Sequence, residues 1–195
     1  MRTLSRVYDT YSQAREVVNG LKAAGIPDDS VSIVANKHVS AEYDDVDDVS
    51  GAATGAGIGA VVGGAGGLLA GLGLMAIPGV GPVVAAGWLA ATLAGAVAGA
   101  AAGGIVGALV DLGVSEHDAE VYSEVIRRGG TLVTVRVDDN RVAAAEAILD
   151  RYAPIDPVRR REEYASAGWA GYDPKAEPYT ISDAERERIR APYRS

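Results

Sequence analysis

The chain has 195 residues, a formal net charge of −8, 25 glycines, and neither cysteine nor phenylalanine. Without cysteine there is no disulfide framework, no thiolate metal site and no thiol nucleophile. The acidic balance excludes a general nucleic-acid binder, because clustered Lys and Arg side chains supply the affinity for phosphates. We also expect no signal peptide, because Met1–Asn36 lacks the long apolar run of such a leader.

Residues 1–50 are predicted to form a strand, a helix and a second strand, the first half of a sandwich domain. The first strand is Thr3–Tyr8, and Thr10 or Ser12 caps the helix that follows. Apolar residues recur at helical spacing, and a turn with Gly25 and Pro27 ends the helix. The residues behind these expectations are Ala14, Val17, Val18 and Leu21 for the helix, and Val31, Ile33 and Val34 for the second strand.

Residues 51–110 contain no Asp, Glu, Lys, Arg or His, so every charge of the chain lies outside this insert. Small residues recur every fourth position and predict a smooth groove along two helices that pack closely. Pro78–Pro82 interrupts the pattern and is predicted to be the turn of an antiparallel helical hairpin. The expected packing residues are Gly51, Gly55, Gly59, Gly63, Gly67, Gly71, Gly87, Ala91, Gly95, Gly99, Gly103 and Gly107, and the turn residues are Pro78, Gly79, Val80, Gly81 and Pro82.

Two environments suit such a hairpin. Arms of about 25 residues are long enough to cross a bilayer, which predicts a bacterial inner-membrane protein whose two halves are cytoplasmic. The acidic flanks, such as Asp44–Asp48 and Asp111, and the many glycines oppose insertion. The alternative is therefore a soluble cytoplasmic homo-oligomer whose hairpins form a shared core, so the expected partners are a second copy of the chain or the lipid bilayer.

Residues 111–158 repeat the strand and helix pattern of the N-terminal half. Ser115 begins a helix that ends at Gly129, Leu132–Val137 is a strand, and a last helix begins at Asp138–Asn140 and ends before Pro154. The predicted fold class is α+β, a split ferredoxin-like sandwich with helices on one face, interrupted by the glycine-rich antiparallel helical hairpin. Residues 159–195 are predicted to be a polar, largely extended tail containing Tyr and Pro, with a short helix from Ser182.

Three stretches of the sequence resemble bacterial general stress proteins of the heat-induced or low-temperature-induced type. They are AIPGVGPVVAAG (Ala76–Gly87), GAAAGGIVGALVDLGVSEHDAEVYSEVIRRGGTLVTV (Gly99–Val135) and AEAILDRY (Ala145–Tyr152). The resemblance covers about residues 1–158. It implies a stress-induced protein with a glycine-zipper insert, often regarded as a membrane protein, and no assigned enzymatic activity.

Chemical motifs are weak throughout. Gly55–Ala60 and Gly71–Ala76 fit only a relaxed dinucleotide fingerprint, and neither follows a credible strand. Ser115, His117 and Asp118 are interpreted as a helix start rather than a nucleophilic triad or metal site, and Arg159–Arg161 as a solvated linker. We therefore expect no catalytic, cofactor-binding or metal-binding residues and no enzyme; a small-molecule sensor built on the sheet is a third hypothesis.

Overall fold

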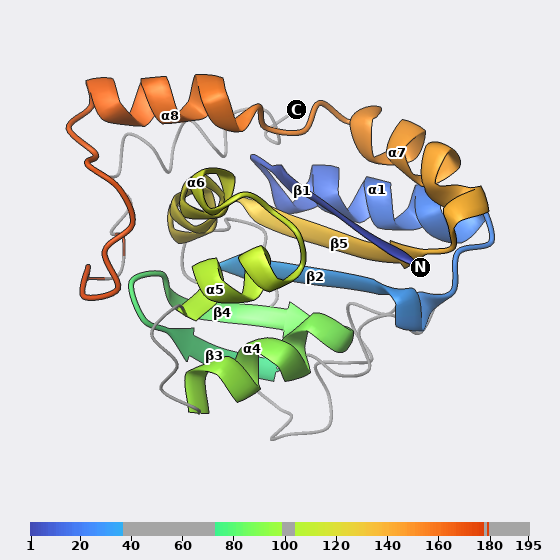
Figure 1. Ribbon diagram of the computed structural model, residues 1–195, viewed down its shortest axis with the longest axis horizontal. Coiled ribbons are helices and arrows are strands. Elements are labelled where there is room, and N and C mark those ends of the chain that lie inside the picture. Colours follow the sequence, from blue (N-terminus) through green and yellow to red (C-terminus); the bar gives the residue numbers. More distant parts are fainter. Residues whose placement is uncertain (37–72, 99–103, 178, 180–195) are drawn as a thin grey trace, which may run out of the picture.

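The computed structural model describes residues 1–36, 73–98, 104–177 and 179, and these form a five-stranded antiparallel sheet with helices on both faces (Figure 1). The strand order is β1-β5-β2-β4-β3. The predicted α+β class is confirmed at this level.

The N-terminal half has the predicted elements. Strand β1 (Arg2–Tyr8) leads into helix α1 (Tyr11–Ala23), a 3-10 turn at Asp28–Ser30 and strand β2 (Val31–Asn36). Thr10 caps α1: its side chain accepts from the Gln13 amide, and the Gln13 side chain accepts from the Thr10 amide. This reciprocal capping box satisfies two amides that have no partner within the helix.

The predicted helical hairpin is wrong around its turn. A turn does occupy residues 78–80, but it joins strand β3 (Gly73–Ile77) to strand β4 (Gly81–Ala86). Residues 83–86 of β4 pair with β2 and are buried. The backbone hydrogen bonds to this distant strand therefore determine the conformation here, and the helical spacing of the small residues does not. Positive φ angles at Gly79 and Gly81, 73° and 95°, fit the turn between the strands and are foreign to a helix.

In the second arm of the predicted hairpin, which follows the turn, the first helix begins at Trp88. Helix α4 (Trp88–Ala98) and helix α5 (Gly104–Asp111) follow β4. Gly87 lies in the bend before α4, Ala91 and Gly95 within α4, and Gly107 within α5. Gly51–Gly71, Gly99 and Gly103 lie outside the described residues, so the packing role of the glycine series stays a prediction.

The C-terminal part contains helix α6 (Glu116–Arg127), strand β5 (Thr131–Val137), a 3-10 turn at Asp139–Arg141 and helix α7 (Val142–Asp150). These match the predicted elements. Helix α8 (Pro157–Ser166) does not, because an extended chain was expected from residue 159. The helix expected from Ser182 lies outside the described residues.

Helices cover both faces of the sheet, so the split ferredoxin-like arrangement with one covered face is not confirmed. Helices α1 and α7 pack on one face with Val133 and Val135 of β5, whereas α4, α5 and α6 pack on the other with Leu132. The physical reason is that apolar side chains alternate to both faces of the central strands, and both faces must be covered.

Candidate functional site

The β3–β4 turn of the insert is held closely by a segment near the C-terminal end of the described chain. The Tyr172 hydroxyl donates to the Pro78 carbonyl oxygen at 2.6 Å. A Cβ atom at Gly79 would overlap the backbone of Asp173 and Pro174, and Val80 is fully buried. The segment after α8 therefore clamps the turn, and it descends to this end of the sheet in Figure 1.

The other end of β4 is fixed where α4 starts. The Ser32 hydroxyl of β2 accepts a hydrogen bond from the Leu89 amide at 3.0 Å. The Arg136 guanidinium lies 3.3 Å from the centre of the Trp88 ring, a cation–π contact between β5 and α4. The Trp88 Nε1 is buried and has no hydrogen-bond partner in the described part of the chain.

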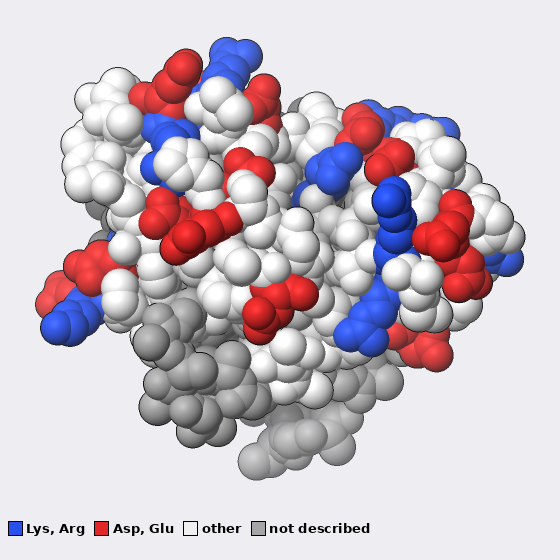
Figure 2. Space-filling model, viewed as in Figure 1, with Lys and Arg blue, Asp and Glu red and all other residues white. Residues whose placement is uncertain are grey.

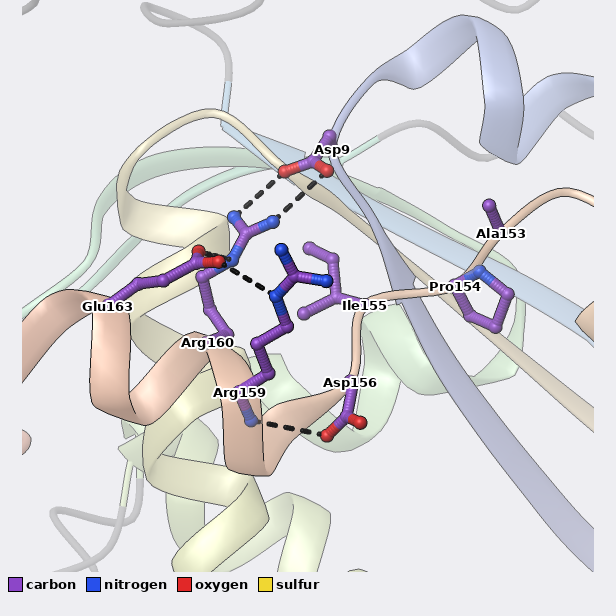
Figure 3. A pocket seen from close by; sticks show the side chains of 8 residues that line it. All are labelled: Asp9, Ala153, Pro154, Ile155, Asp156, Arg159, Arg160 and Glu163. Atoms are coloured by element: carbon purple, nitrogen blue, oxygen red, sulfur yellow. Dashed lines mark hydrogen bonds and ion pairs between the residues drawn. The ribbon is translucent and has the colours of Figure 1, made fainter.

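Helix α8 is attached to the domain by ion pairs. Arg160 makes two hydrogen bonds to the Asp9 carboxylate, at 2.8 and 3.1 Å, and its Nε lies 3.1 Å from Glu163. Arg161 bonds the Glu120 carboxylate of α6 at 2.8 Å. A cavity of about 270 Å³ lies beside these groups (Figure 3), lined by Asp9, Ala153, Pro154, Ile155, Asp156, Arg159, Arg160 and Glu163.

A buried carboxylate organises the C-terminal end of α6. Glu124 accepts two hydrogen bonds at 2.8 Å from Arg127 and one at 2.6 Å from Arg128. The Arg128 guanidinium also lies 4.4 Å from the centre of the Tyr164 ring of α8. Burial raises the pKa of the Tyr164 phenol, and the nearby arginines offset part of that rise. Glu124 thus positions Arg128, which connects α6 with α8 through the Tyr164 ring.

The described residues contain no cluster of acidic or histidine side chains that could hold a metal ion. The Ser115 hydroxyl accepts from the Asp118 amide at 3.1 Å, as expected for a helix cap, and the His117 carbonyl oxygen accepts from Arg161. Within the described part of the chain, no helix is long and apolar enough to span a bilayer. The first dinucleotide-like stretch lies outside the described residues, and most of the second is strand β3.

Sequence reasoning missed the role of Arg159–Arg161. Instead of a solvated linker, they lie on α8, and each pairs with a carboxylate: Glu163 for Arg159, Asp9 for Arg160 and Glu120 for Arg161. A local signal for the helix was present in Asp156 followed by Pro157, an N-cap residue with proline at the first helical position.

Comparison with known proteins gives one family match. Residues 3–76 match the family model described as the Heat induced stress protein YflT domain, which is less than half of the chain. This confirms the resemblance to bacterial general stress proteins and supports a stress-response role. The matched range lies almost wholly before the three stretches that suggested the resemblance. No curated protein and no solved structure gives a significant match.

Proposed function

We propose that this stress-response protein acts by self-association, with the charge-free insert as the contact between copies. The observation that carries the proposal is the segregation of charge: a chain of net charge −8 has no charged residue from Gly51 to Val110. Copies approaching through their other surfaces bring many carboxylates together, whereas the insert brings none.

The described part of the insert supports this surface. Figure 2 shows charged side chains across the upper part, the middle and the sides of this face, with a small white area low on it, and helix α4 carries no charged residue. Ala91 and Thr92 of α4 are exposed, and Val110 at the end of α5 is 41% exposed. These residues are available to a second copy without unfolding the domain.

Gly107 is the most informative position. It lies within α5, where glycine costs about 1 kcal/mol relative to alanine. No described atom lies within 4 Å of the position that a Cβ would occupy, so packing among the described residues does not account for the glycine. A second helix approaching closely at Gly107 does account for it.

The test is sedimentation velocity of the purified full chain without detergent, over a range of concentrations. We expect an oligomer that Gly107→Gln weakens, because a bulky polar side chain blocks close approach while favouring the helix itself. The matched control is Ala144→Gln on the exposed side of α7, which should leave the oligomer unchanged. The proposal would be overturned if the protein is a monomer at all concentrations, or if both variants associate equally. It would also be overturned if the protein can be recovered only with detergent, which would favour a lipid partner.

A further inference from the structure

The C-terminal part of the described chain forms an arm that is attached by ion pairs, hydrogen bonds and a few apolar side chains. We define the α8 arm as residues 155–177. Of these residues, only Ile155 and Tyr164 are buried. The partly buried Trp169 and Tyr172 also pack against the apolar cluster under α6. The polar and ring contacts between the arm and the domain include the Ile155 amide to the Val7 carbonyl oxygen at 2.8 Å, Arg160 to Asp9, Arg161 to Glu120, Arg128 over Tyr164, and Tyr172 to Pro78.

The hinge that connects this arm to α7 is strained. Ala153 has a φ of 49°, the one non-glycine residue with positive φ among the described residues. This left-handed conformation brings Cβ against the backbone, and Pro154 restricts the chain further. The cavity of about 270 Å³ borders the hinge at Ala153 and Pro154, so little packing compensates for the strain (Figure 3).

We propose that the α8 arm is exchanged between two copies of this chain, so that the arm of each copy docks on the Asp9, Glu120 and Pro78 sites of the other. The partner that fits these docking sites is a second copy of this chain. An exchanged arm makes the same ion pairs and ring contacts with the other copy that the closed arm, docked on its own chain, makes within one copy. Extending the hinge removes the left-handed strain at Ala153, and strained short hinges favour such exchange. This contact goes beyond the proposed function, because it uses a different surface from the charge-free insert.

Charge reversal tests the exchange directly. In Asp9→Arg, Arg160 faces a second arginine; in Arg160→Asp, the new carboxylate faces Asp9 and Glu163. Neither variant regains the pair within one chain, but an exchanged dimer of one copy of each restores both pairs. We expect native mass spectrometry of an equimolar mixture, briefly warmed and cooled, to show mixed dimers in excess of random pairing. The double variant Asp9→Arg/Arg160→Asp, which restores the pair within one chain, is the control and should show no excess when mixed with wild type.

A second variant addresses the hinge. Ala153→Gly accepts the positive φ without strain, so it should favour the closed arm and lower the exchanged fraction about threefold. Ala144→Gly on α7 is the matched control and should leave the fraction unchanged. Mixed dimers at random proportions, or none, overturn the exchange. If the exchange fails this test but an oligomer remains and Gly107→Gln weakens it, the proposed function stands without the exchange. If mixed dimers still form in the Gly107→Gln background, the exchange is independent of the contact through the insert.

Discussion

The hydroxyl of Ser32 caps a helix that begins 56 positions later in the chain, accepting a hydrogen bond from the Leu89 amide at 3.0 Å. Ser32 is fully buried on β2 and Leu89 is in the first turn of α4. The cap therefore comes from a neighbouring strand instead of the residue that precedes the helix. It ties the start of α4 to the sheet, because losing it leaves an amide of α4 without its partner.

We expect Ser32→Ala to lower the free energy of unfolding by about 1 kcal/mol, the usual cost of removing a helix cap. Urea unfolding followed by circular dichroism measures this. The exposed Ser166, whose hydroxyl bonds a carbonyl of its own helix, provides the control: Ser166→Ala should change stability by less than about 0.5 kcal/mol. Equal effects of the two substitutions would contradict the capping role of Ser32.

Gly87 and Gly113 form a natural matched pair, because their φ angles are 85° and 89°. A Cβ at Gly87 would overlap the Val31 carbonyl oxygen and the Ser32 hydroxyl, whereas no described atom lies within 4 Å of a Cβ at Gly113. Gly113→Ala should therefore cost about 1 kcal/mol from backbone strain alone. Gly87→Ala should cost at least about 2 kcal/mol more, because backbone must also move. Thermal and urea unfolding of both variants check the difference, and similar costs would contradict the close approach.

Among the described carboxylates, Glu124 should be the one whose substitution lowers the free energy of unfolding most. Its side chain is 4% exposed and holds Arg127 and Arg128, which are 16% and 27% exposed. Breaking a buried ion pair typically costs about 3–5 kcal/mol, and the partial exposure of the arginines reduces this to about 2 kcal/mol for Glu124→Ala. Glu120→Ala breaks the Arg161 pair, whose side chains are 25–30% exposed, and should cost about 0.5 kcal/mol. Urea unfolding would contradict the prediction if both variants lost equal stability.

The local elements of the fold could be predicted from sequence, and the arrangement of the insert could not. Thr10 and Ser115 mark helix starts through residues three positions apart, so their signal is contained in a short stretch. The strand conformation of Val83 depends on its pairing with Asn36, and the helical glycine spacing gave no indication of it.

The attachment of α8 was equally hidden. Its partners Asp9 and Glu120 lie 151 and 41 positions from Arg160 and Arg161, and no local pattern specifies pairs at such separations. The helix itself was marked by Asp156 and Pro157, so its existence was readable from the sequence although its contacts were not.

Tyr8 predicts how stability responds to alkaline pH. Its side chain is fully buried, its hydroxyl donates to the Leu149 carbonyl oxygen at 2.8 Å, and burial raises its pKa above the ordinary value of 10.0. Because the folded-state pKa is the higher one, the stabilisation is fully present below pH 10.0 and is lost as the pH rises from there toward the folded-state pKa. Tyr122 and Tyr164 are shifted in the same direction, also mainly by burial.

The variant that isolates this effect is Tyr8→Phe. At neutral pH it should be less stable than the wild type by about 1 kcal/mol, because the hydrogen bond to Leu149 is lost. Above pH 10.0 that difference should shrink and then reverse, since phenylalanine has no proton to lose when the protein unfolds. Urea unfolding at a series of pH values from neutral to strongly alkaline measures both free energies. A difference that stays constant across pH 10.0 would show that Tyr8 ionises equally in the folded and unfolded chain, and would sink the assignment of its raised pKa to burial.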